Sequence, residues 1–424
     1  MTLCKKGWLY IIALVSAFFM FSLDISAQNN INSPYTRFGY GRLNDLGFSR
    51  NQAMGGIGYA LRTRQHINPA NPASFSSIDS TSFIFEFGVS GLFSNFSSGT
   101  TNKTTFTSNL EYLAFQIPVT KWLGLSAGMV PYSFIGYDYK FTDSISVPNN
   151  LDATEMPYQQ SFNGKGGISQ VYFGLSASFL KHFSLGVSAY YLFGNLSHYR
   201  ALHFLVERMP AYYTIQTSTM FVRSFNFHYG IQYFQTFAKK HDLVVGLVYD
   251  HQSKLTGDLT VNTLGVDTLI VSAKEMFDLP NMYAGGIAYT YDKRLTVGVD
   301  FMFQEFSKTR FMGVVDSLGN RAKLSLGAEY IHKPLGNRYI DRVRWRFGTN
   351  YSQSYVNIKG YNTHDFGITF GVGLPLKTTK TMLNVNFEYG YINNREALLL
   401  KENYYKIGLN VNLNELWFFK PKIQ

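Results

Sequence analysis

The stretch RVRWRFGTNY at residues 342–351 shows the pattern that decides the fold. Apolar side chains fall on one side of the extended chain: Val343, Trp345, Phe347 and Tyr351. Polar side chains fall on the other: Arg342, Arg344, Arg346 and Asn350. Successive side chains of a β-strand point to opposite faces, so this stretch predicts a strand with one apolar and one cationic face. About fourteen such stretches fit either a soluble sandwich or a barrel with its apolar face toward lipid.

The first 27 residues predict a secretory signal peptide. A basic start is followed by a short apolar run from Trp8 to about Leu23, and then by small residues that end at Ala27. A membrane-anchoring helix is the alternative, but the run is short for one. Cys4 is the sole cysteine, so we expect neither disulfides nor thiolate chemistry in the mature chain.

The composition favours the lipid-facing barrel. The 424 residues include 37 Phe and 30 Tyr, only 15% are charged, and the mean hydropathy is −0.08. Aromatic girdles combined with a half-polar wall are typical of outer-membrane barrels. The net charge of +11 is spread over turns and polar strand faces, which argues against nucleic acid as a partner. We therefore expect an outer-membrane location in bacteria, with membrane lipid as a partner.

The alternating stretches and their connections predict an antiparallel transmembrane barrel of about 14 strands over residues 81–413. Strands are expected to begin near Ser82, Ser108, Trp122, Ile168, Phe183, Ser218, Leu243, Asn281, Arg294, Ala322, Arg342, Asp365, Thr381 and Tyr404. Short connections such as 181–182, 292–293 and 377–379 alternate with long ones at 142–167 and 251–280. Short turns are expected in the periplasm and long loops outside. An even strand count leaves residues 414–424 as a periplasmic tail.

The predicted inward faces carry both signs of charge. Six residues are expected to line the lumen: Asp300, Glu329, Arg342, Arg344, Arg346 and Glu388. Unpaired charges in a narrow lumen are costly, so we expect ion pairs or hydration. A network that braces the wall and a conduction filter are the two alternatives. Inward glycines are expected to let the strands curve.

Residues 28–80 do not alternate, and they carry the clearest family resemblance. AMGGIGYA at 53–60 and NPANPAS at 68–74 resemble the Gly-rich and Asn-Pro-Ala segments in the hatch of the long-chain fatty-acid transporter (FadL) family. Downstream, LPNMYAGGIAY at 279–289 and LGAEY at 326–330 are similar to strand segments of that family.

The resemblance implies a 14-stranded barrel with residues 28–80 as a hatch inside the lumen. It also implies uptake of hydrophobic small molecules, with sideways exit through a gap beside a kinked third strand. Pro131 lies in the third predicted strand and lacks the N–H that completes a ladder, with Gly128 and Gly136 on either side. These three residues are the expected kink, and an ordinary bulge is the alternative.

Two groups of hatch residues are candidates for positioning a ligand or the hatch itself. The two Asn-Pro steps predict rigid turns at Asn68, Pro69, Ala70, Asn71 and Pro72. Arg62 and Arg64 are candidates to receive a carboxylate head group, since a guanidinium binds carboxylates through two donors. The alternative is that they pair with wall carboxylates, namely Asp300, Glu329 or Glu388.

Two functions stay open at this stage. The first is passive uptake of fatty-acid-like molecules. The second is a non-transporting accessory barrel subunit of an outer-membrane protein assembly or secretion complex, in contact with other outer-membrane or periplasmic proteins. The tail after the last strand departs from the family's aromatic end and motivates this second function. Scattered histidines and the lack of a phosphate-binding loop predict no enzyme, no metal and no cofactor.

Overall fold

The computed structural model describes residues 31–98, 101–148, 153–205, 213–264, 268–272, 274, 276–315, 318–358, 360–376, 380–393 and 400–416. The predicted signal peptide, the turn 377–379 and most of the predicted tail lie outside these ranges. Within them, no helix is long and apolar enough to cross a membrane.

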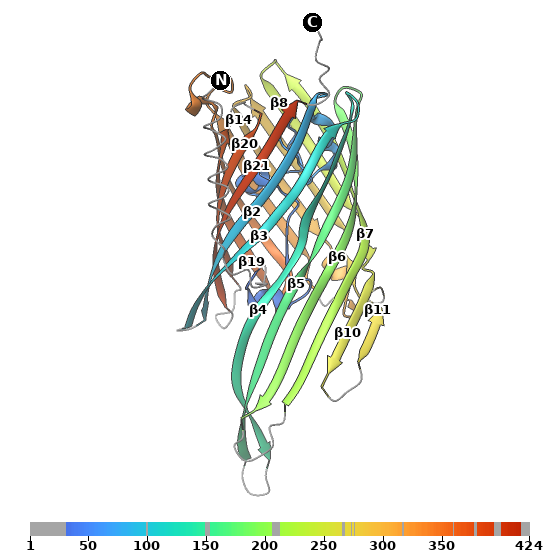
Figure 1. Ribbon diagram of the computed structural model, residues 1–424, viewed down its shortest axis with the longest axis vertical. Helices are drawn as coiled ribbons and strands as arrows, with labels where there is room; N and C mark the ends of the chain where they lie inside the picture. The colour runs from blue at the N-terminus through green and yellow to red at the C-terminus, as the bar shows by residue number, and fades with distance from the viewer. Residues whose placement is uncertain are drawn as a thin grey trace, which may run out of the picture.

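Fourteen long strands form one closed antiparallel barrel, which confirms the predicted all-β class (Figure 1). They are β2 (Ser82–Ser98), β3 (Thr101–Pro118), β4 (Leu123–Pro148), β5 (Ala153–Phe179), β6 (Phe183–Phe204), β7 (Tyr213–Phe237), β8 (His241–Asp250), β13 (Met282–Tyr291), β14 (Leu295–Gln304), β17 (Arg321–Ile331), β18 (Arg344–Ile358), β19 (Tyr361–Pro375), β20 (Met382–Asn393) and β21 (Lys401–Leu416). Each pairs with the next in this order, and β21 closes the wall on β2.

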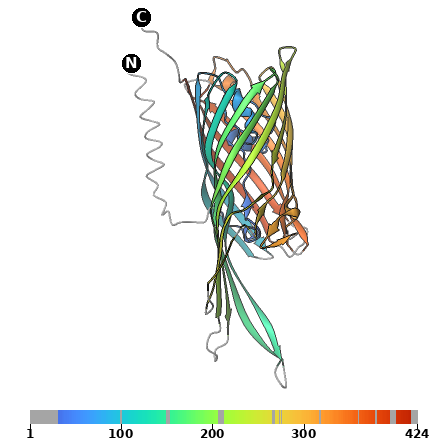
Figure 2. The same cartoon turned by 90° about the vertical axis from the view of Figure 1, so that its right-hand side faces the viewer.

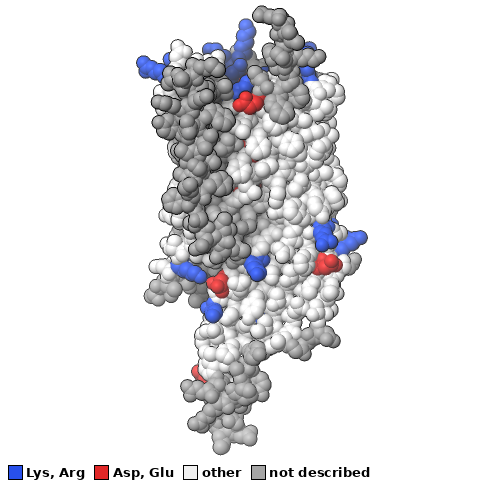
Figure 3. All heavy atoms as spheres, viewed as in Figure 1, with Lys and Arg blue, Asp and Glu red and all other residues white. Residues whose placement is uncertain are grey.

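Side chains alternate across the wall as the sequence predicts. On β14, Leu295, Val297 and Val299 are exposed on the outside, whereas Thr296 and Asp300 are buried inside. The outer surface in Figure 3 is largely uncharged between two levels where Lys, Arg, Asp and Glu gather. This band is the part of the wall suited to hydrocarbon.

One end of the barrel carries the predicted short turns. Consecutive residues with positive φ form three of them: Leu180–Lys181, Ala238–Lys239 and Asp292–Lys293. Two such residues in a row make the mirror-image hairpin turns whose twist matches that of the flanking strands. The turns are brief and place lysines at this rim.

The opposite end differs from the prediction, because much of the expected loop 142–167 is β-structure. β4 and β5 stay paired out to Pro148 and Ala153. β10 (Gly257–Thr263) extends this sheet from β7, and β11 (Leu269–Ser272) follows. The outer parts of β4–β7 with β10 and β11, here the projecting sheet, reach beyond the rest of the barrel (Figures 1 and 2). Gly and Asn at 163–167 hide the strand in the sequence, but ladders on both sides override their weak strand preference.

The connections between the long strands contain smaller elements. They are two short strand pairs, β9 (Ser253–Lys254) with β12 (Asp278–Leu279) and β15 (Arg310–Phe311) with β16 (Val314–Val315), and two 3-10 turns, η4 (Phe306–Lys308) and η5 (Tyr339–Arg342). Val343 directly follows η5 and is 2% exposed. It therefore does not share the outward face predicted for it.

Residues 31–81, here the inner segment, run inside the barrel (blue in Figure 1). The segment contains η1 (Pro34–Arg37), β1 (Arg42–Leu43), the short helix α2 (Ser49–Ala53) and η2 (Pro72–Ser77). α2 packs against β18–β21, and η2 packs against β4–β7. The segment therefore touches opposite sides of the wall.

Inward glycines make room for this segment. A Cβ atom at Gly348 would lie 2.1 Å from the backbone nitrogen of Gly55, and one at Gly327 would lie 2.2 Å from the carbonyl oxygen of Met54. Similar close approaches define what we call the glycine belt: Gly124, Gly186, Gly230, Gly246, Gly327, Gly348 and Gly371. Strand curvature is the role expected of inward glycines, but at these positions the inner segment leaves no room for a Cβ atom. Its backbone makes the close approach at five of them, and side-chain atoms of Asn71 and Ala53 do so at Gly230 and Gly371.

The last strand is longer than predicted. β21 continues to Leu416, and Asn414 is paired with Ile84 of β2. The first three residues of the predicted tail 414–424 therefore belong to the wall.

Filling the glycine belt should weaken the fold. We expect Gly348→Ala to lower the free energy of unfolding by about 1–3 kcal/mol, the usual cost of overpacking, because the new methyl group meets backbone. Gly408→Ala is the control, since its Cβ would lie 3.6 Å from the nearest side chain. Urea unfolding of both variants in lipid vesicles measures the difference, and equal transitions would contradict the role given to the belt.

Candidate functional site

Two asparagines hold the inner segment in its bend. The Nδ2 of Asn68 donates to the carbonyl of Gly58 at 2.7 Å. The Oδ1 of Asn71 accepts from the backbone N–H of Ala73 at 3.0 Å and caps η2, while its Nδ2 donates to the carbonyl of Tyr59 at 2.7 Å. Both amides thus serve the segment's own backbone, which makes the region of the Asn-Pro steps a fixed bend.

The neighbouring candidates pack against β7. The Nε2 of His228 donates to the carbonyl of Ala70 at 3.1 Å. The Cδ of Pro72 lies 2.8 Å from where a Cβ at Gly230 would be, and Pro69 is buried. These residues fix the segment to the wall, and a role in holding a ligand stays a prediction.

The two candidate arginines of the inner segment differ in their surroundings. Arg64 pairs with Asp79 at 3.1 Å, and its side chain is 75% exposed. Arg62 donates to the carbonyl of Ala73 and to the hydroxyl of Ser178, both at 3.0 Å. The expected alternative, pairing with the wall carboxylates Asp300, Glu329 or Glu388, is wrong for both arginines.

Arg62 is a cation held by neutral acceptors and an aromatic ring. Its guanidinium carbon lies 4.2 Å from the ring centroid of Phe234. Burial, and secondarily the nearby charge of Arg64, lower the pKa of Arg62 to about 10. No carboxylate lies within ion-pair distance of Arg62 in the described part of the chain.

Glu329 is the centre of a cluster with three arginines. Its carboxylate contacts Arg50 of α2 at 2.8 Å and Arg346 of β18 at 2.7 Å, with Arg344 at 3.7 Å. Arg346 is fully buried. One carboxylate thus joins the inner segment to two wall arginines, which is a bracing arrangement.

The other predicted lumen charges lie apart from this cluster. Asp300 accepts from the backbone N–H groups of Gly58 and Tyr59 at 2.5 and 2.8 Å. Glu388 accepts from the hydroxyl of Tyr404 at 3.2 Å. Arg342 ends η5, outside the strand in which it was predicted. The six residues therefore do not form one network.

A second group of ion pairs, centred on Asp45, was not predicted from the sequence. Asp45 of the inner segment binds Arg321 at 2.7 Å and Lys323 at 2.5 Å. Although burial alone would raise it, these two cations hold the pKa of Asp45 well below its usual range. The sequence contains a clue to these ion pairs. Asp45 and Asp79 are the sole acids between residues 28 and 80, and Arg321 and Lys323 are two residues apart, so they lie on the same face of a strand.

Three further carboxylates of the wall were also missed. Glu111 pairs with Lys406 at 2.9 Å. Glu402 accepts from the hydroxyl of Ser33 at 2.6 Å, and Glu86 accepts from the backbone N–H of Ile67 at 2.9 Å. Glu402 and Glu86 thus bind a hydroxyl and a backbone N–H of the inner segment, whereas Glu111 pairs with a lysine of the wall.

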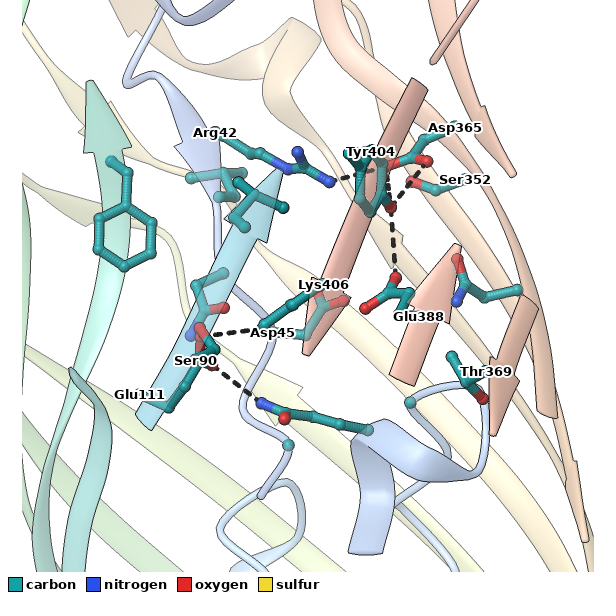
Figure 4. A pocket seen from close by; sticks show the side chains of 18 of the residues that line it. Arg42, Asp45, Ser90, Glu111, Ser352, Asp365, Thr369, Glu388, Tyr404 and Lys406 are labelled. Atoms are coloured by element: carbon teal, nitrogen blue, oxygen red, sulfur yellow. Dashed lines mark hydrogen bonds and ion pairs between the residues drawn. The ribbon is translucent and has the colours of Figure 1, made fainter. Parts of the chain in front are cut away.

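A polar cavity of about 150 Å³ lies between the inner segment and the wall (Figure 4). Charged side chains of both signs line it, among them Arg42, Asp45, Glu111, Asp365, Glu388 and Lys406. Its size and lining suit water or small ions rather than an apolar molecule.

The lumen at the long-loop end is filled by aromatic side chains. Tyr40 of the inner segment lies 5.3 Å from Phe311, and Phe306 stacks on Tyr355 at 4.4 Å between ring centroids. Tyr40 and Phe306 are fully buried. This cluster packs the lumen at the long-loop end of the barrel.

The wall is interrupted between β3 and β4. Their ladder covers Leu113–Pro118 against Gly124–Met129 and goes no further among the described residues. Beyond it, β1 pairs with β4 in place of β3, with Leu43 opposite Ser133. The inner segment thus covers the edge of β4 that β3 leaves.

The predicted kink residues lie along this interruption. Gly128 is within the last paired stretch of β4, and the register against β5 shifts between Pro131 and Ser133. The carbonyl of Pro131 accepts from Asn44, and the carbonyl of Gly136 accepts from the backbone N–H of Ser33. Gly128, Pro131 and Gly136 thus lie along the break in the β3–β4 ladder. A lateral exit at this place stays a prediction.

Comparison with known proteins adds a family and a fold. A family model described as BamG matches residues 10–424. Among curated proteins, no relative matches the chain.

Solved structures with similar folds include a Pseudomonas aeruginosa FadL homologue, at 11% identity and a TM-score of 0.52, covering 88% of this chain and 98% of that one. The monoaromatic hydrocarbon channel CymD has 13% identity and a TM-score of 0.54, with coverage of 90% and 100%. The Ralstonia pickettii toluene transporter TbuX has 14% identity and a TM-score of 0.51, with coverage of 88% and 99%. At such identities the likeness concerns the fold, and a barrel of this kind implies the outer membrane.

Removing the central carboxylate should destabilise the barrel strongly. Glu329→Gln leaves three arginines without their counter-charge, and breaking a buried pair in this way costs about 3–5 kcal/mol. Glu388→Gln is the control, because Glu388 mainly accepts one hydroxyl. Unfolding free energies from urea titration should separate the two variants, and losses of the same size would refute the bracing role of Glu329.

His66 should make stability depend on pH. Its Nδ1 lies 3.4 Å from Glu86, and burial lowers the pKa of His66 to about 4 from 6.5. Between these pH values the unfolded chain binds more protons, so the free energy of unfolding falls as the pH drops through this window. We expect His66→Gln to flatten this part of the stability profile, and a profile identical to that of the wild type would count against the assignment.

Proposed function

Because the chain belongs to the BamG family, we propose that it serves as a non-transporting accessory barrel subunit of an outer-membrane protein assembly or secretion complex. The observation that carries the proposal is the filled lumen. Ion pairs, backbone hydrogen bonds and aromatic packing occupy it, and the cavity beside the inner segment is small and charged.

Such a cavity is a poor site for a hydrophobic molecule. Each CH₂ group gains about 0.8 kcal/mol only when it moves from water into apolar surroundings. In this cavity it would meet side chains such as Arg42, Asp365 and Glu388, and would displace the water that solvates them. An apolar substrate therefore gains little by entering.

The projecting sheet supports the same proposal. On β6 the outward side chains change from Tyr191 and Phe193 in the apolar band to Ser197 and Tyr199 further out. On β6 the outward face thus becomes more polar beyond the apolar band, whereas Leu269 and Ile270 of β11 stay apolar and exposed. A surface of this size beyond the membrane gives partner proteins a place to bind.

A second function, passive uptake of hydrophobic small molecules, has one observation in its favour. The ladder between β3 and β4 stops beside Pro131, where a lateral exit would require a break. The fold shared with hydrocarbon channels fits this reading.

A disulfide across the interruption tests both functions. Leu43→Cys with Ser133→Cys joins directly opposed residues of β1 and β4 and locks the inner segment over the break. In cells that lack the natural chain, we expect the oxidised double variant to restore normal levels of other outer-membrane barrels. Cells with the wild-type chain, cells with the oxidised variant and cells without the chain should all take up a radiolabelled fatty acid to the same extent.

The reduced double variant and Ser133→Cys alone are the controls. Uptake that requires the wild-type chain and disappears on oxidation would overturn the accessory proposal in favour of transport. Unchanged levels of other barrels in cells without the chain would also count against it.

A further inference from the structure

A groove crosses the outer surface of the wall near the short-turn end. One of its ridges is a row of outward side chains that are register partners on five neighbouring strands: Leu123, Ala177, Leu185, Ile231 and Leu247. The groove has a volume of about 580 Å³ and an almost entirely apolar lining.

The second ridge and the floor follow from the same register. Leu175, Val187, Tyr229 and Tyr249 form the other ridge, as partners two residues along each strand. Between the ridges the side chains point inward, so the floor is backbone. Gly186 and Gly230, which are paired with each other, lie in the middle of it.

The shape of the groove is long and narrow. Neighbouring strands lie about 4.8 Å apart, so a row across five strands is about 19 Å long. This is comparable with an extended acyl chain of a phospholipid. The width of the groove equals the distance between successive outward residues of one strand. It therefore has room for one acyl chain but not for two side by side.

The groove also has a direction relative to the membrane surface. Leu123 is two residues from Lys121 in the first turn, about 7 Å along the strand. Leu247 is seven residues from Lys240, about 23 Å along its strand. The groove therefore starts at the rim of the wall and descends into the apolar band.

Charge and aromatic residues mark the shallow end. Lys121 and Lys181 are exposed there, and neither forms an ion pair with any residue that the structure describes. Trp122, 55% exposed, sits beside Lys121 at the height where amphipathic rings meet lipid head groups. Lysines next to a membrane surface attract anionic lipid.

We propose that this groove binds one acyl chain of an anionic glycerophospholipid, whose phosphate group lies at Lys121 and Lys181. The apolar ridges and backbone floor receive the chain, and the two cations select the head group. This site lies outside the lumen and does not depend on the proposed function.

Native mass spectrometry of the full-length chain tests the site. The protein is released from nanodiscs that contain phosphatidylglycerol or phosphatidylcholine with identical acyl chains. We expect the wild type to retain one phosphatidylglycerol and several-fold less phosphatidylcholine. Val187→Trp fills the groove and should abolish retention of both lipids.

Matched variants keep the test specific. Val297→Trp changes a residue of the same type and the same 39% exposure on β14, and should retain lipid as the wild type does. Lys121→Glu with Lys181→Glu should remove the preference for phosphatidylglycerol, whereas Lys293→Glu, at another turn of the same rim, should not. Unchanged gel mobility of the unheated protein shows that each variant is folded.

Three results would overturn the proposal. Equal lipid retention by wild type and Val187→Trp would exclude the groove, and an unchanged preference in the double lysine variant would exclude the head-group site. A dimer that replaces the lipid-bound monomer, and that Val187→Trp dissociates, would assign the groove to a second copy of the chain.

Discussion

The inner segment can lie against the wall because the glycine belt has no side chains to hold the two apart. At Gly246 even a methyl group would lie 1.9 Å from the carbonyl oxygen of Tyr59, so backbone meets backbone directly. Short polar groups then suffice to bridge the two. Asp300 reaches the N–H groups of Gly58 and Tyr59, and Asn71 reaches the carbonyl of Tyr59, only because this approach is so close.

Ion pairs in the lumen connect the inner segment with the wall. Glu329 joins Arg50 to Arg346, and Asp45 joins Arg321 to Lys323, so each carboxylate connects the inner segment with the wall. Desolvation makes such groups costly unless every charge has its partner. The same pairs that offset this cost attach the inner segment to the wall at the cavity residue Asp45 and at Arg50.

The strands of the wall can be predicted well from the sequence, whereas the contacts of the inner segment can be predicted only poorly. Lipid on one face imposes a two-residue period on every strand, so Leu295, Val297 and Val299 can be placed from the sequence alone. No such period governs the contacts of Arg62, whose two partners on the wall, Ser178 and Gln232, lie 116 and 170 residues away in the sequence. The strand before Ile168 escaped prediction for a related reason, because Gly and Asn at 163–167 carry no apolar alternation and are held by neighbouring ladders.

The contacts of the inner segment have a consequence for the speed and order of folding. Ser33 bonds Glu402 across 369 residues of sequence, and Arg50 bonds Glu329 across 279. Contacts so distant in the chain are entropically expensive to form first, and folds rich in them form slowly. A segment that touches β4 on one side and β19–β21 on the other brings both ends of the sheet toward each other. The final pairing of β21 with β2 then closes a much shorter effective loop than the sequence between them suggests.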